Sequence, residues 1–86
     1  MTLTADVLQD DLALSVAYVM TTANKRATEL GVNVLESFIT ITQNFDHGFR
    51  WRVNYGPKDY INHRGGDLIV EVDAEDMTVR QVLRGQ

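Results

Sequence analysis

The 86-residue sequence contains no cysteine, and this absence excludes two kinds of stabilisation. Neither a disulfide nor a thiolate zinc site can support a chain that is already near the lower size limit for a hydrophobic core. The fold must therefore be held by packing of its apolar residues, which make up an ordinary 44% of the chain and argue against disorder. For so small a chain, self-association is a further way to bury surface.

Basic residues and long apolar runs are also scarce. The chain has 8 Lys and Arg against 12 Asp and Glu, and the net charge of −4 disfavours nucleic acid as a partner, because phosphate binding depends on concentrated positive charge. No apolar run approaches the length of about 20 residues that spans a bilayer. The first residues lack the basic and apolar regions of a secretory signal. We therefore expect a cytoplasmic single domain over residues 1–86 that binds neither nucleic acid nor membrane.

Residues 4–30 have the period of one long amphipathic helix. Apolar residues recur there at spacings of three and four, which places them on one face: Leu8, Leu12, Val16, Val19, Met20, Ala23, Ala27 and Leu30. Two starts remain open, because Thr4 could cap the helix directly or Asp10 and Asp11 could cap a shorter helix. Gly31 follows the last periodic residue and is expected to end the helix in a left-handed conformation.

The rest of the chain alternates polar and apolar residues, which predicts strands at about 37–43, 49–55, 68–73 and 78–84. The first strand would turn Ile39 and Ile41 inward, and the last would turn Val79 and Leu83 inward. Residues 56–67 form a connection longer than usual. The predicted fold class is α+β, with the helix packed on a curved four-stranded antiparallel meander in the order 1-2-3-4, a cystatin-like arrangement.

Charged side chains on the outward face of this sheet sort by strand. Arginines on the second and fourth strands flank acids on the third, in the set Arg50, Arg52, Glu71, Asp73, Arg80 and Arg84. This order favours cross-strand ion pairs over the alternative, an anion- or carboxylate-binding face built from the arginines.

The sequence shows no catalytic or metal-binding pattern. His47 and His63 both fall in predicted loops, and a metal site would need at least three convergent ligands. Ser37 has no motif around it that would make it a nucleophile. Gly65 and Gly66 lack the strand, helix and Lys-Ser/Thr context of a phosphate loop. We therefore expect no enzymatic activity, no cofactor and no metal.

Binding residues are expected on the sheet face and on the long loop, because connections of that length often carry function. The candidates are Arg50, Arg52, Lys58, Tyr60, His63 and Arg64. Trp51, Tyr55 and Phe49 could line a ligand pocket, but at strand spacing they are expected to form core against the helix.

The C-terminal part of the chain resembles the "GG…V-VDA-TG-V" ending of two protein groups. The matching residues run from Gly65 to Glu75 and continue with Val79, Val82 and Arg84-Gly85-Gln86. The groups are the PepSY-type propeptide-like modules and the small bacterial NTF2-fold (cystatin-like) immunity and hypothetical proteins. This sequence departs from them at Asp76-Met77, where the groups usually have a Thr-Gly turn. The resemblance covers about the last 22 residues and implies a helix followed by an antiparallel sheet that wraps it.

Members of these groups mostly inhibit a protease or neutralise a toxin, and they supply no catalytic residues. The expected function is therefore that of a small, non-enzymatic protein-binding module, of inhibitor or immunity type, whose partner is another protein or a second copy of itself. Two alternatives stay open. One is a ligand-binding or enzymatic cone between helix and sheet, and the other is a structural homodimer that pairs edge strands or sheet faces.

Overall fold

The N-terminal helical segment is divided into two helices. The computed structural model describes residues 5–45, 48–57 and 67–84, in which α1 spans Ala5–Leu8 and α2 spans Asp11–Glu29. Asp10 adopts an extended backbone, and its Oδ1 accepts a hydrogen bond from the Ala13 N–H at 2.9 Å. This N-cap ends the continuity of the helix. The prediction of a single helix over about 4–30 is therefore wrong at its start, and the later of the two open starts is the correct one.

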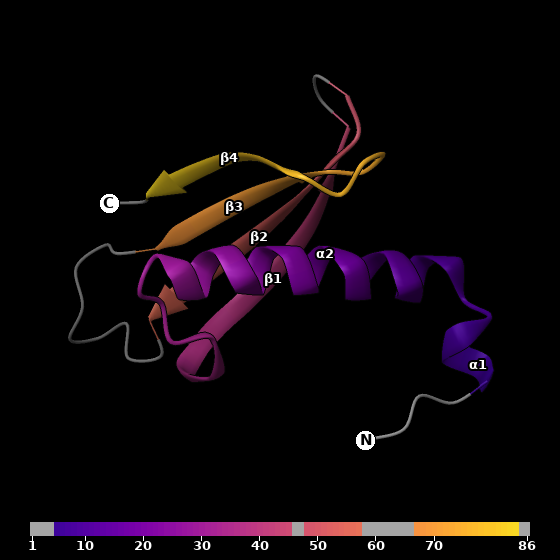
Figure 1. The fold of residues 1–86 in the computed structure, drawn as a ribbon, viewed down its shortest axis with the longest axis horizontal. Coiled ribbons are helices and arrows are strands. Elements are labelled where there is room, and N and C mark those ends of the chain that lie inside the picture. The colour runs from indigo at the N-terminus through magenta and orange to yellow at the C-terminus, as the bar shows by residue number, and fades with distance from the viewer. Residues whose placement is uncertain (1–4, 46–47, 58–66, 85–86) are drawn as a thin grey trace.

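The predicted apolar face of the helix is also shorter than expected. Leu8 and Leu12 are 52% and 57% exposed. In Figure 1, α1 turns away from the axis of α2, and the first turn of α2 projects past the sheet. At the other end the prediction is confirmed, because Gly31 adopts a φ of +89°. The Gly31 and Val32 N–H groups donate to Thr28 and Ala27, which closes the helix as a Schellman motif.

The four predicted strands form a single antiparallel meander. After a 3₁₀ turn, η1 (Val34–Glu36), the strands are β1 (Ser37–Asn44), β2 (Arg50–Pro57), β3 (Leu68–Asp73) and β4 (Val79–Arg84). Their order in the sheet is β1-β2-β3-β4, as predicted. The connection after β2 begins later than expected, because Gly56 and Pro57 still pair with Phe38 and Ser37.

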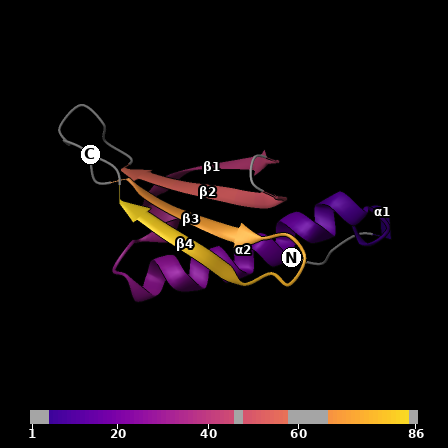
Figure 2. The ribbon, with the colours of Figure 1, turned by 90° about the horizontal axis from the view of Figure 1, so that it is seen from above.

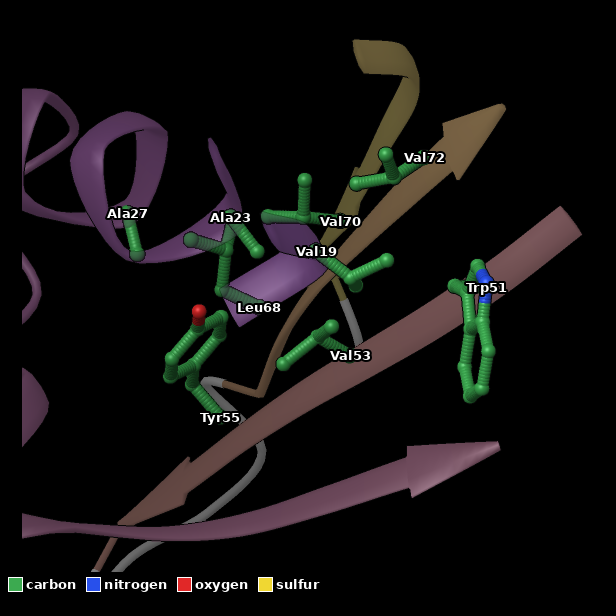
Figure 3. Close-up of a cluster of buried hydrophobic side chains, with 9 residues drawn as sticks. All are labelled: Val19, Ala23, Ala27, Trp51, Val53, Tyr55, Leu68, Val70 and Val72. Carbon is green, nitrogen blue, oxygen red and sulfur yellow. The ribbon is translucent and has the colours of Figure 1, made fainter. Parts of the chain in front are cut away.

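The helix lies across one face of the sheet and covers it unevenly. It packs mainly on β3, with β2 and β4 on either side. Figure 2 shows β1 at the side of the sheet that is farthest from α2. The core between the two layers is drawn in Figure 3 and consists of Val19, Ala23, Ala27, Trp51, Val53, Tyr55, Leu68, Val70 and Val72. None of these nine residues comes from β1.

A hydrogen bond joins the two layers inside this core. The Tyr55 hydroxyl donates to Asn24 Oδ1 on α2 at 2.6 Å, and Tyr55 is only 2% exposed. Burial raises the pKa of Tyr55 from 10.0 to about 12. Trp51 is 5% exposed, so the prediction that Trp51 and Tyr55 belong to the core is confirmed. The prediction is wrong for Phe49, which precedes β2 and is 42% exposed.

A β-bulge changes which residues of β4 face the helix. Val72 pairs with Val79 but Glu71 pairs with Gln81, so Arg80 is an extra residue in β4. An extra residue reverses the alternation of side chains beyond it. Val82 rather than Leu83 therefore packs toward the core, and Leu83 is exposed on the outward face, contrary to the prediction. Arg84 also turns to the helix side, where its Nη2 donates to the Leu30 carbonyl at 3.4 Å.

The turn between β3 and β4 contains Met77 with a φ of +58°. Left-handed backbone suits glycine, which is the residue that the resembled groups carry at this place. Met77 adopts it because its side chain packs against the core and its N–H donates to the Asp73 carbonyl at 3.0 Å. The departure from the Thr-Gly turn is therefore compatible with the hairpin.

In the part of the chain that the structure describes, no helix combines the length and apolar character that a transmembrane span needs.

The core position of Ala23 leads to a stability test. Ala23 is fully buried, and an Asp there would place an unpaired charge between helix and sheet. We expect Ala23→Asp to cost about 3–5 kcal/mol, out of a total of about 4–13 kcal/mol for a chain of this length. Urea unfolding followed by circular dichroism measures the loss.

Ala17→Asp is the matched control, because Ala17 lies on the exposed side of the same helix. It should unfold close to the wild-type midpoint. A folded Ala23→Asp protein with the wild-type midpoint would show that the core has been misplaced.

Candidate binding surface

The outward face of the sheet is organised around one buried carboxylate. Glu71, on β3, is 4% exposed although it faces away from the helix. Arg50 Nη1 donates to its Oε1 at 3.2 Å, and Arg52 donates to its Oε2 through Nε at 3.0 Å and Nη2 at 2.6 Å. Both arginines come from β2, where they lie opposite Asp73 and Glu71 in the register. Glu71 is thus neutralised by two cations, which makes its burial tolerable.

The two arginines hold the pKa of the Glu71 carboxyl below its ordinary value of 4.5. The hydrogen bond from Arg52 is the largest cause, and burial acts in the opposite direction. The ionised form of Glu71 is therefore the form that the fold stabilises.

A second ion pair closes the far end of this face. Asp73 Oδ2 accepts from Arg80 at 2.8 Å (Nε), and Asp73 Oδ1 accepts from the Glu75 N–H at 2.7 Å. These contacts hold the pKa of Asp73 below 3.8, with the Glu75 N–H as the largest cause. Arg80 reaches Asp73 from the bulge position in β4. The bulge and the ion pair therefore occur at the same point of the sheet.

The predicted cross-strand ion pairs are present as a ladder across β2, β3 and β4, with one change: Arg84 is not part of it. A pocket of about 230 Å³ lies at the end of the ladder and is lined by Gly48, Phe49, Arg50, Asp73, Glu75 and Arg80. Its two arginines are matched by two acids. This composition gives no support to the alternative of an anion-binding face.

The other predicted binding residues, Lys58, Tyr60, His63 and Arg64, lie outside the described residues. Within the described ranges, no group of three or more His, Asp or Glu side chains is placed to hold a metal. A second pocket of about 490 Å³ lies beside α2 and is lined by Thr21, Thr22, Lys25, Arg26, Glu29 and Val79. Neither this pocket nor the one at the end of the ladder is lined by Trp51 or Tyr55, whereas Phe49 lines the latter.

The edge strand β1 is a surface that the sequence did not single out. It pairs with β2 on one side, and no other described strand pairs with it. Its helix-side residues, Ile39 and Ile41, pair with Tyr55 and Val53 of β2. Ile39 is nevertheless 38% exposed, and Ile41 is only half-buried. Thr40 and Thr42, on the outward face, are exposed. The expectation that Ile39 and Ile41 lie inside the core is therefore wrong for Ile39 and only partly right for Ile41.

The two edges of the sheet differ in how they are protected against pairing. β4 carries a bulge and two arginines, which are devices that discourage another strand from adding. β1 runs regularly through eight paired residues and contains no charged residue and no proline before Asn44. The sequence did contain a sign that this edge is unprotected, because residues 37–45 are uncharged in a chain that is 23% charged.

Exposed apolar side chains gather at both ends of β1. Leu35 in η1 is 93% exposed, and Phe45 immediately after β1 is 68% exposed, the two highest values among the large apolar residues that the structure describes as exposed. Phe45 stacks on Phe49 with ring centroids 4.9 Å apart. Apart from this stacking, most of the apolar area of Leu35 and Phe45 stays in water in the single chain.

Comparison of the chain with protein-family models, with curated proteins and with solved structures gave no match. The resemblance to PepSY-type and NTF2-fold proteins therefore stays a prediction.

The buried carboxylate gives a pH-dependent prediction. Because the folded-state pKa of Glu71 is lowered, its ion pairs stabilise the fold above pH 4.5, and this contribution is lost as the pH falls through the lowered pKa. Glu71→Gln should therefore cost about 1.5–3 kcal/mol at pH 7, the range for hydrogen bonds to charged groups. The difference from wild type should shrink toward pH 3. Urea unfolding at both pH values measures it.

Glu75→Gln is the control, since Glu75 is an exposed carboxylate in the adjacent turn. It should leave the pH 7 midpoint nearly unchanged. An equal loss for Glu71→Gln at pH 7 and at pH 3 would contradict the electrostatic explanation.

Proposed function

We propose that the protein is a non-enzymatic protein-binding module with a cystatin-like arrangement of one helix on a four-stranded meander, and that it binds by adding a partner strand to β1. The observation that carries this proposal is the unprotected edge of β1, which is regular, uncharged and not covered by α2. An inhibitor or immunity-type role is the form of protein binding that the resemblance implies.

The backbone of β1 supplies the affinity in this mode of binding. The outer side of an edge strand presents N–H and C=O groups that a second strand can satisfy, and main-chain hydrogen bonds of this kind do not depend on the partner's sequence. Specificity then comes from side chains on alternate positions. On β1 these are Ile39 and Ile41 on the helix side and Thr40 and Thr42 on the outward side.

The arginine face has a supporting role in this proposal. Arg50 and Arg52 remain 34% and 41% exposed at their side chains while bound to Glu71. They can contact a partner's rim with their remaining donors, but exposed charges contribute more to orientation and association rate than to affinity. β1 is therefore the main contact, and the outward face next to it is secondary.

Thr40→Lys tests this function. Thr40 is exposed, so the fold should be kept, and a lysine on an edge strand disfavours strand addition. Complexes formed in native lysate by the tagged wild type should show slow hydrogen–deuterium exchange at β1 backbone amides. Thr40→Lys should lose both the complexes and this protection.

Gln81→Lys is the matched control, because Gln81 is an exposed polar residue on the opposite edge strand. It should retain binding and β1 protection. Binding that survives Thr40→Lys, or complexes whose β1 amides exchange as fast as in the free protein, would overturn the proposal.

A further inference from the structure

α2 is too narrow to cover β1 in addition to the other three strands. A helix with its side chains is about 10–12 Å across, whereas four strands spaced by about 4.8 Å place the outer strand axes about 14 Å apart. With α2 centred on β3, its width reaches β2 and β4 and stops short of β1. Figure 2 shows that no described element lies on the far side of β1.

We infer that the strand that adds to β1 is β1 of a second copy of this chain, antiparallel and centred on Thr40, so that two sheets join into one of eight strands. This inference rests on the proposed function, because it names the partner of the same edge. Three features of the strand carry it: the absence of charge, the pairing of its side chains, and the placement of its flanking apolar residues.

The first feature is electrostatic. Two copies of the chain, each with a net charge of −4, repel one another weakly wherever their charged surfaces meet. Residues 37–45 contribute none of this charge. An antiparallel meeting of two β1 strands therefore brings no like charges opposite each other, which would be destabilising in a strand pair.

The second feature is the match of side chains. When Thr40 lies opposite Thr40 of the second copy, Ile39 lies opposite Ile41 and the alternation of faces is preserved. On the helix side, four isoleucines, two from each chain, then meet beside Tyr55 and Val53, whose rows they continue. Pairs of β-branched residues at facing positions are favourable in sheets. This arrangement covers the side chain of Ile39, which is 38% exposed in the single chain.

The third feature lies outside the strand. Leu35 and Phe45 are five residues before and five residues after Thr40, so a two-fold axis at Thr40 brings Leu35 of one copy near Phe45 of the other at both ends of the strand pair. These are the two most exposed of the large apolar residues described as exposed. A strand pair alone buries less than the roughly 800 Å² per partner of a standard interface. The flanking contacts add to the buried area at both ends.

A cysteine placed on the axis tests this geometry, because the native chain has no cysteine to interfere. In Thr40→Cys, the two new side chains face each other with Cβ atoms about 4.5–5.5 Å apart, close enough for a disulfide after small adjustment. Mild oxidation should convert this variant to a covalent dimer that disappears on reduction.

Thr42→Cys is the matched control, since it is the same substitution on the same exposed face of β1. In this register its partner lies about 13 Å away along the strand, at about 3.3 Å per residue over four residues. It should stay monomeric in denaturing gels. Equal cross-linking of the two variants, or cross-linking of Thr42→Cys alone, would overturn the register.

The mass in solution is the second measurement. Light scattering of the wild type should give about 19 kDa, twice the 9.7 kDa of one chain. Thr40→Lys should fall to the mass of one chain, because two lysines would face each other on the axis.

A wild-type protein of one-chain mass that still captures another protein through β1 would overturn the second copy as partner and leave the proposed function standing. A dimer that survives Thr40→Lys would likewise overturn the second copy as the partner of β1, because self-association would then use a different surface. The proposed function fails separately, if other proteins still bind Thr40→Lys or leave the β1 amides unprotected.

Discussion

The rest of the structure depends on one constraint: a single helix must cover a sheet of four strands. α2 covers the sheet at β2, β3 and β4, where Val53, Val70 and Val72 are fully buried. The same packing leaves β1 without a second layer, so its helix-side isoleucines are only partly covered. The described part of this 86-residue chain contains no other long helix that could cover β1. The exposed strand is therefore a consequence of size and layering, not of an irregular sequence.

The outward face of the sheet contains a buried charge, which neighbouring side chains compensate. β3 is an inner strand, and its outward residue Glu71 is enclosed by β2 and β4 even without a second layer above it. Two arginines from β2 compensate the buried carboxylate, while Arg80 is directed to Asp73 by the bulge in β4. These charged side chains therefore pair with one another within the sheet. Their arrangement fixes the neighbours of β3 and protects the β4 edge, which makes β1 the edge that is open to a partner.

The sequence predicted the local structure well because each pattern depends on near neighbours. Alternation at 68–73 identified β3 exactly, and Gly31 marked the end of the helix. The charge order along the strands also predicted cross-strand ion pairs between arginines and acids, which the structure contains as Arg50 and Arg52 with Glu71 and Arg80 with Asp73. The errors concern long-range geometry. Asp10 breaks a periodicity that continues through it, and the residues of β4 alternate equally well whether Leu83 or Val82 faces the core.

The candidate surface was harder to predict for the same reason. Ile39 and Ile41 have the alternation of a half-buried strand, and this pattern cannot tell whether the covering helix reaches that strand. That information lies in the position of α2 over β3, which is set by Val19, Ala23 and Ala27 together. The strand order was predicted, but the burial of Glu71 was not, because it depends on how closely the Arg50 and Arg52 side chains enclose the carboxylate. The lack of charge over residues 37–45 was the one local signal.

Joining two chains through β1 would also place their other surfaces relative to one another. A register that sets Ile39 opposite Ile41 keeps like faces on the same side of the joined sheet. Both copies of α2 would then lie on one side, and both ion-pair clusters around Glu71 would lie on the other as one continuous polar face. The arginines of that face, Arg50 and Arg52, would be presented twice, symmetrically about the axis. Self-association at the edge is therefore compatible with binding of a further protein on the outward face, because the two use different surfaces of the same sheet.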